Sequence, residues 1–233
     1  MSDKPTERLV LEQIEVVYGQ HRVLEPSTLA IPRGSVTALL GRNGTGKSSV
    51  FRSLFGLYRN RDLCISIDGT FVRQPYRQAG LINYVPQGAS HPPQLTVARY
   101  LQYYQIDRER FLSDYPLFAS HVDHRLGELS FGTARLLLCL IALRADTRYT
   151  VLDEPFSNVM PVHNEMLIAA IRAARARKGI LLSDHQYRTV LDVANTLYLI
   201  LDRRIRLLRD PGELSELGYL PDGAAPAPRR NTG

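Results

Sequence analysis

Residues 41–48 read Gly41-Arg42-Asn43-Gly44-Thr45-Gly46-Lys47-Ser48 and match the pattern G-x-x-x-x-G-K-[ST]. An apolar segment, 35–40, precedes them and is expected to be a strand, and a segment with helical spacing, 47–57, follows. The glycines let the backbone turn so that several N–H groups point at phosphate oxygens beside a helix N-terminus. The pattern therefore predicts a phosphate-binding loop between a strand and a helix. A glycine-rich turn without chemistry is the weaker alternative.

Two adjacent carboxylates, Asp153 and Glu154, follow an apolar segment further along the chain, residues 149–152. Acidic groups at the end of a buried strand are costly unless a metal ion or hydrogen bonds compensate them. Mg²⁺ held at the phosphate loop by the Ser48 hydroxyl would supply that compensation. Asp153 is then expected to hold Mg²⁺, and Glu154 to act as a general base on a water that attacks the phosphate. An Asp-Glu pair alone is weak, but downstream of such a loop it is a strong indication.

The hydrophobic pattern predicts alternating strands and helices, which implies a largely parallel sheet with helices on both faces. The expected strands are 9–17, 23–31, 35–40, 81–85, 149–152 and 180–183, the expected helices are 47–57, 133–143, 164–177 and 186–194, and a hairpin is expected over 196–208. Residues 87–129 differ in composition, with tyrosines, histidines and short amphipathic pieces. We expect them to form an inserted, mostly helical lobe.

The chain has 233 residues, 44% of them hydrophobic and 22% charged, which is ordinary for a globular protein and argues against disorder or a fibrous protein. The longest apolar run, 136–143, is too short to span a bilayer. Segment 1–8 has no apolar stretch, so we expect a flexible terminus rather than a secretory signal, and 221–233 is expected to be a disordered Pro/Ala-rich tail. Cys64 and Cys139 are expected to be buried free thiols.

The formal net charge of +6 fits nucleic acid, an anionic membrane or a phosphorylated ligand, and does not choose among them. The basic residues are scattered singly, which is typical of a solvated surface.

Further short motifs occur in the order typical of the ATP-binding cassette (ABC) ATPases. Leu129-Ser130-Phe131-Gly132-Thr133 stands where that family has its LSGGQ signature, Gln87 matches the Q-loop glutamine, His185 the switch histidine and Tyr18 the aromatic residue that stacks on adenine. Each match is weak alone, because a single His, Tyr or Gln is more often structural. Their order and spacing make the sequence resemble the ABC ATPases over residues 9–220.

The resemblance implies a P-loop NTPase fold of the ABC type. It has a mostly parallel core sheet, an N-terminal antiparallel β subdomain, and a short helical subdomain at about 88–144. It also implies an ATP-hydrolysing transporter subunit that drives a separate transmembrane permease, on the inner face of the cytoplasmic membrane. A second ABC ATPase domain, identical or paralogous, would close a head-to-tail dimer over ATP, and no nucleic acid is expected as a partner.

The same resemblance assigns the site residues, with ATP and Mg²⁺ as cofactors. Glu154, His185, Gln87 and Lys47 are expected to be catalytic, and Ser48, Gln87 and Asp153 to serve the metal ion. ATP contacts are expected from Tyr18, Gly41, Asn43, Gly44, Thr45, Gly46, Lys47, Ser48 and Ser49, and from Ser130 and Gly132 across the dimer.

Three positions depart from the family pattern. Phe131 replaces a signature glycine, Thr133 replaces the signature glutamine, and Met160 stands where an aspartate is common. These departures keep open an alternative from another class, a slow ATP-driven dimerisation switch that takes no part in transport. A P-loop kinase or GTPase is disfavoured, because neither needs Glu154, the signature and His185 together.

Overall fold

The computed structural model describes residues 7–88 and 91–221, so the expected flexible segments at 1–8 and 221–233 lie almost wholly outside the described residues. Glu7 and Arg8 differ from that expectation. Glu7 pairs with Arg33 and Arg148, and Arg8 begins the first strand. None of the helices among the described residues is long and apolar enough to cross a membrane.

The N-terminal part forms an antiparallel sheet. Its strands are β1 (Arg8–Tyr18), β2 (His21–Pro32), β4 (Cys64–Ile67) and β5 (Thr70–Phe71), in the order β2-β1-β4-β5. The last two strands were not expected, because each is four residues or shorter and too short for an alternating pattern to stand out. Cys64 lies in β4 and is partly exposed, so the expectation that it is buried is wrong, whereas Cys139 is buried.

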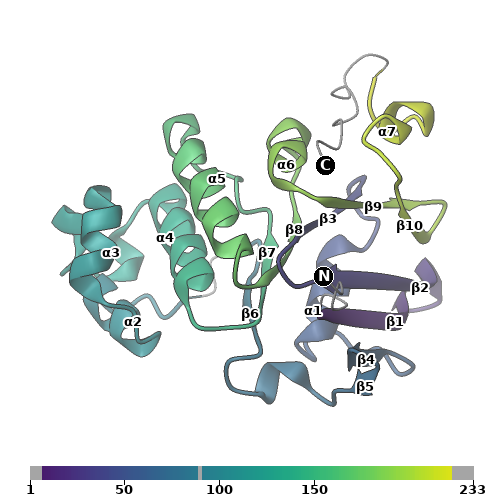
Figure 1. Ribbon diagram of the computed structural model, residues 1–233, viewed down its shortest axis with the longest axis horizontal. Helices are drawn as coiled ribbons and strands as arrows, with labels where there is room; N and C mark the ends of the chain where they lie inside the picture. The colour runs from purple at the N-terminus through teal and green to yellow at the C-terminus, as the bar shows by residue number, and fades with distance from the viewer. Residues whose placement is uncertain (1–6, 89–90, 222–233) are drawn as a thin grey trace, which may run out of the picture.

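A six-stranded sheet forms the centre of the molecule (Figure 1). Its strands are β3 (Val36–Gly41), β6 (Ile82–Val85), β7 (Tyr149–Asp153), β8 (Gly179–Ser183), β9 (Thr196–Leu201) and β10 (Arg204–Leu207), in the order β10-β9-β3-β8-β7-β6. All neighbouring pairs are parallel except β9 and β10. The carboxyl ends of β3, β7 and β8 therefore meet at one edge.

Helices cover the central sheet and extend beyond it (Figure 1). They are α1 (Lys47–Leu54), α2 (Val97–Tyr103), α3 (Arg108–Asp114), α4 (Phe131–Arg144), α5 (Pro161–Arg175), α6 (Tyr187–Val193) and α7 (Glu213–Glu216), with 3₁₀ turns at Pro75–Arg77, Pro116–His121 and Leu126–Glu128. The first helix ends at Leu54 rather than at the expected residue 57, and Gly56 follows with φ 64°. A glycine at positive φ is typical of a helix end.

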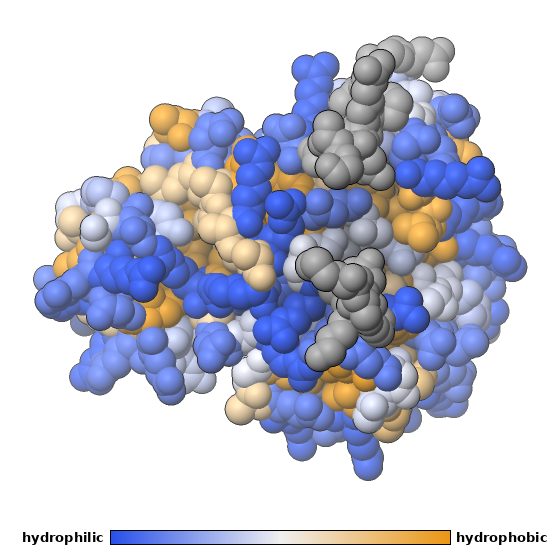
Figure 2. Space-filling view, in the orientation of Figure 1, coloured by the Kyte–Doolittle hydropathy of each residue, from blue (hydrophilic) through white to orange (hydrophobic). Residues whose placement is uncertain are grey.

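Two hydrophobic clusters lie on the two faces of the central sheet. Leu39 belongs to the cluster with α1 and the antiparallel sheet, while its neighbours Ala38 and Leu40 belong to the cluster with α4 and α5. Successive side chains of a strand point to opposite faces, so burial on both faces explains why β3 is mainly apolar and does not alternate between apolar and polar residues. On the face in Figure 2, hydrophobic residues form small separate patches among hydrophilic ones.

Candidate active site

The phosphate loop joins β3 to α1, as the sequence predicts. Gly44 and Gly46 have φ of 78° and 98°, values that L-residues with a side chain rarely adopt. A Cβ atom on Gly41 would lie 2.7 Å from Thr45 Oγ1 and 3.2 Å from Ile200 Cβ. The loop therefore needs glycine at these three positions, for its turns or for its close packing.

Lys47 lies inside this loop with its side chain almost fully covered. Its Nζ donates to the backbone oxygens of Gly41 at 2.7 Å and Arg42 at 3.0 Å. Burial lowers the pKa of Lys47, and the nearby carboxylates of Glu154 and Asp153 oppose that shift. Two backbone carbonyl groups of the loop thus hold the ammonium group in place.

One cavity is lined by residues from segments that lie far apart in the sequence. The cavity holds about 280 Å³ and is lined by Tyr18, Asn43, Gly44, Gly46, Lys47, Ser48, Ser49, Gln87, Glu154 and His185. All ten are expected site residues. Five other expected site residues lie outside this lining: Gly41, Thr45, Ser130, Gly132 and Asp153.

Asp153 is the last residue of β7 and is buried beside the start of α1. Its carboxylate hydrogen-bonds the Ser48 hydroxyl and accepts from Tyr84 Oη at 3.2 Å. Burial raises the pKa of Asp153, and these two hydrogen bonds lower it. A buried carboxylate next to a hydroxyl provides oxygen ligands of the kind that Mg²⁺ prefers.

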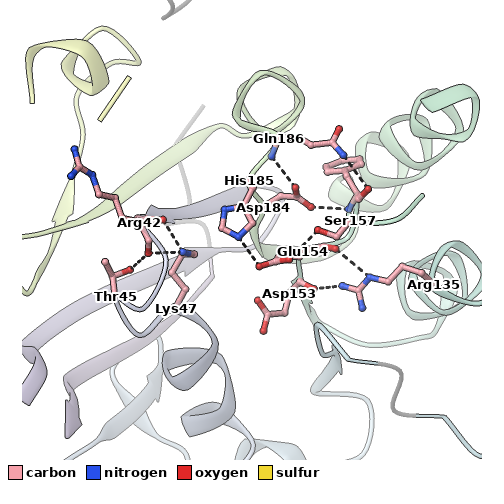
Figure 3. Close-up of polar contacts among 12 residues, drawn as sticks. Arg42, Thr45, Lys47, Arg135, Asp153, Glu154, Ser157, Asp184, His185 and Gln186 are labelled. Carbon is pink, nitrogen blue, oxygen red and sulfur yellow. Dashed lines mark hydrogen bonds and ion pairs between the residues drawn. The ribbon is translucent and has the colours of Figure 1, made fainter. Parts of the chain in front are cut away.

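Glu154 has φ 56°, a left-handed conformation that is uncommon for residues other than glycine. Its backbone N–H donates to Ser183 O at 2.7 Å, which ties this turn to β8. Its side chain then points toward His185, as Figure 3 shows, with Nε2 of His185 2.8 Å from Oε1. Strained backbone of this kind is concentrated at functional sites, where the surrounding structure enforces it.

Asp184 was not singled out in the sequence, although it helps to hold the same site. Its carboxylate accepts from the backbone N–H groups of Phe156 at 2.8 Å and Gln186 at 2.9 Å, and burial raises its pKa. These bonds join the turn after Glu154 to the turn that carries His185 (Figure 3). Its neighbours in the sequence gave no signal, because its role depends on which backbone groups fold around it.

Tyr18 lies at the end of β1 with about half of its surface exposed. Its hydroxyl hydrogen-bonds Ser49 Oγ, and its ring packs edge-on against Tyr58 with 5.9 Å between the ring centroids. One side of the ring is therefore anchored, while the residue still lines the cavity.

The signature segment, residues 129–133, forms the start of α4. Ser130 caps this helix by accepting from the backbone N–H of Thr133 at 3.2 Å. A Cβ atom on Gly132 would lie 2.1 Å from the backbone oxygen of Asn158, so a glycine is required for the close approach of the loop after Glu154. Phe131 and Met160 are both about half exposed.

The segment after α7 packs against the outer side of the phosphate loop, which was not predicted. Arg42 Nη2 donates to Gly218 O at 3.3 Å, and the Tyr219 hydroxyl accepts from the backbone N–H of Gly41. The tyrosine ring itself packs against the hydrophobic cluster that includes α4 and α5. This contact depends on tertiary packing and has no local sequence signal.

Comparison with known proteins agrees with this geometry. A model of the ABC transporter family matches residues 24–157, which is more than half of the chain. The lipopolysaccharide export system ATP-binding protein LptB of Haemophilus influenzae is 30% identical, covering 82% of this chain and 86% of its own length. A probable branched-chain amino acid transport ATP-binding protein, LivF, of Archaeoglobus fulgidus is 27% identical over 85% of this chain and 90% of its own.

Solved structures show the same fold. The ATP-binding subunit of an ABC transporter superposes with a TM-score of 0.76 at 23% identity, covering 93% of this chain and 95% of that one. A nucleotide-free ATP-binding cassette superposes with a TM-score of 0.71 at 21% identity, over 92% and 96% of the two chains. The expected ABC-type fold is therefore confirmed. By the family match and the LptB relative, the chain belongs to the ABC transporter family, and it is an ATP-binding subunit with ATPase activity.

Proposed function

We propose that the chain binds Mg-ATP in the 280 Å³ cavity and hydrolyses it with Glu154 as general base. The observation that supports this most is the meeting of the phosphate loop, Glu154 and His185 around one cavity at the carboxyl ends of β3, β7 and β8. Ligands in open α/β sheets bind outside the carboxyl ends of the strands. Lys47 would bind the phosphates and Tyr18 the adenine base.

The residues fit a bound Mg²⁺ ion. Ser48 and Asp153 offer a hydroxyl and a carboxylate, and Gln87 lines the same cavity with an amide. The described residues include no cluster of three His, Cys, Asp or Glu side chains that could hold a metal ion by itself. That agrees with Mg²⁺, which is commonly held by one or two carboxylates together with water and substrate phosphates. When bound, the ion would neutralise charge that develops on the phosphates.

Glu154 would accept the proton of the attacking water, and His185 would hold its carboxylate in place. Ser130 and Gly132, at the N-terminal end of α4, would contact the γ-phosphate of ATP bound to a second ABC ATPase domain, identical or paralogous, because helix N-termini favour anions. The chain would work with a separate transmembrane permease from the cytoplasmic side of the membrane, without nucleic acid. The alternative, a slow dimerisation switch outside transport, is not favoured by the transport names of the relatives.

The assignment is tested by steady-state phosphate release from Mg-ATP, comparing the full chain with Glu154→Gln. Loss of the base is expected to lower kcat by ~10²–10⁴-fold while ATP binding is kept, since Lys47, Ser48 and Asp153 remain. A Glu154→Gln variant with wild-type turnover rejects the base. Co-purification of the tagged chain with a multi-spanning membrane protein tests the transport role, and a chain recovered alone from solubilised membranes argues for the switch.

A further inference from the structure

Arg135 is a buried cation on α4, directly before the apolar run 136–143. Only 3% of its surface is exposed, and it lies five residues after Ser130, the N-cap of α4. A buried guanidinium group is costly unless its donors are satisfied. Its partners therefore indicate what the residue does.

Among the residues that the structure describes, the hydrogen bonds of the Arg135 side chain all end on backbone carbonyl oxygens. Nε donates to Glu154 O at 3.2 Å and Nη2 donates to Asp153 O, which lie at the end of β7. Nη1 donates to Pro86 O and reaches Gln87 O at 3.5 Å, which lie just after β6. Figure 3 shows the guanidinium group entering from its helix toward Asp153 and Glu154, on the side opposite Lys47.

One planar group thus joins three segments. It ties α4, whose N-cap is Ser130, to the backbone of two residues that are expected to be catalytic, Gln87 and Glu154. The guanidinium group presents five N–H donors in a fixed planar arrangement, or fork, so it can donate to the carbonyls of residues 86–87 and of residues 153–154 at the same time. A lysine ammonium is a single point with no such fork.

We propose that Arg135 is a positioning residue for ATP hydrolysis, which fixes the backbone of Gln87 and Glu154 relative to the N-terminal turn of α4. Movement of that turn against a partner's ATP is then passed directly to the base. This rests on the proposed role of Glu154. Arg135 does not line the cavity, and none of its side-chain hydrogen bonds involves the phosphate loop, so we expect it to set the rate of hydrolysis and not the affinity for ATP.

Lys178 provides a matched control. It is also fully buried, and its Nζ donates to two carbonyls at the other end of the same helix, Ala142 O at 3.2 Å and Ala145 O at 2.8 Å. It directly precedes β8, at the edge of the sheet that lies opposite the cavity. Lys178→Met therefore removes a buried cation and its carbonyl contacts without touching the site.

The experiment measures single-turnover hydrolysis of Mg-ATP by the full chain in excess, and separately the dissociation constant of a non-hydrolysable ATP analogue at low protein concentration. Arg135→Met is expected to lower the single-turnover rate constant by about 10- to 100-fold, the effect of a misplacement near 1 Å. Its dissociation constant should stay within about threefold of wild type. Arg135→Lys should give an intermediate rate, and Lys178→Met the wild-type rate per folded molecule.

A merely structural role would give a different result. The rate would then fall only in proportion to the folded fraction, or together with ATP affinity, as for any destabilised variant. Either outcome, or a wild-type rate in Arg135→Met, overturns the proposal. If Arg135→Met does not fold, folded Arg135→Lys decides, because a wild-type rate there shows that the fork is not needed. Glu154→Gln is measured in parallel, so an active Glu154→Gln rejects the base itself, whereas an inactive one with a fully active Arg135→Met rejects only the positioning role.

Discussion

His185 Nε2 lies 2.8 Å from Glu154 Oε1, while the second carboxylate oxygen of Glu154 accepts from Ser157 Oγ at 3.0 Å. Both oxygens of the expected base are therefore held by neighbours from different segments, one after β8 and one in the turn after β7. The histidine side chain is about half exposed, whereas the glutamate is almost covered. The imidazole thus forms the outer wall of the cavity and fixes the direction of the carboxylate.

His185→Ala is expected to lower kcat for ATP hydrolysis by about 10²-fold or more, the lower range for a misdirected general base. ATP affinity should change little, because the phosphate loop and Tyr18 are untouched. Steady-state phosphate release and equilibrium ATP binding measure the two effects. Ser157→Ala is the control, since it removes the other carboxylate contact and leaves the His185–Glu154 pair intact. Equal losses in the two variants would show that His185 has no special role.

Tyr18→Ala should weaken ATP binding by about tenfold or more, because base–aromatic stacking is worth about 1–3 kcal/mol. Stacking does not distinguish the exocyclic groups of the base, so the affinities of the wild-type chain for ATP and GTP should differ only modestly. Tyr18→Phe keeps the ring and loses only the hydroxyl contact with Ser49, and should bind nearly as wild type. Equilibrium titration with both nucleotides measures this. Unchanged affinity in Tyr18→Ala would mean that the ring serves packing against Tyr58.

Lys178 should make stability depend on pH. Burial lowers the pKa of Lys178 to about 7, with the charge of Arg177 adding to the shift. The unfolded chain, where the pKa is ordinary, therefore binds more protons between about pH 7 and pH 10, and the free energy of unfolding rises with pH across this window. Lys178→Met lacks this contribution. Urea unfolding of both proteins is measured from pH 6.5 to 9. Above pH 7, the free energy of unfolding of the wild type should rise relative to that of the variant, by up to about 1.4 kcal/mol per pH unit. If the free energies of unfolding of the two proteins depend on pH in the same way, the lowered pKa of Lys178 is contradicted.

The sequence predicts the core of the fold and the site because both depend on local pattern. The loop at 41–48 needs its glycines for turns and close packing that no other residue allows, so it is readable without tertiary knowledge. The buried strands β3, β7 and β8 stand out in the sequence because both of their faces are buried, so most of their residues are apolar.

What could not be predicted depends on tertiary contacts. Arg135 appears in the sequence only as a charge at the edge of an apolar helix, and its four carbonyl partners come from residues 86–87 and 153–154. Tyr219 hydrogen-bonds the backbone of Gly41, although the two residues lie near opposite ends of the sequence. A charge directly beside the longest apolar run of the chain is the signal that could have drawn attention to Arg135.

Phe131 and Met160 support the last prediction. Phe131 is the first residue of α4, and Met160 stands at the N-cap of α5 without a side-chain hydrogen bond to the helix. Both are about half exposed, beside the close contact between Gly132 and Asn158. A glycine would let the backbone approach a phosphate, and an aspartate would both cap α5 and accept hydrogen bonds from a partner.

If these two side chains weaken the half of the site that a partner supplies, the purified chain should hydrolyse ATP slowly although its own residues are intact. Loss of one donor to developing charge is generally worth ~2.7–4 kcal/mol, so Phe131→Gly with Met160→Asp should raise the rate measured by phosphate release. Phe131→Ala is the control that removes the ring without the cost of glycine in a helix, about 1 kcal/mol. Mixing the wild type with a paralogous cassette that has an intact signature should likewise give more activity than the sum of the two. The opposite outcome is a wild-type chain that hydrolyses ATP rapidly and slows when glycine and aspartate are introduced. That result would show that Phe131 and Met160 are adapted parts of the interface. Their apolar surface would then stabilise the closed pair better than the family residues do.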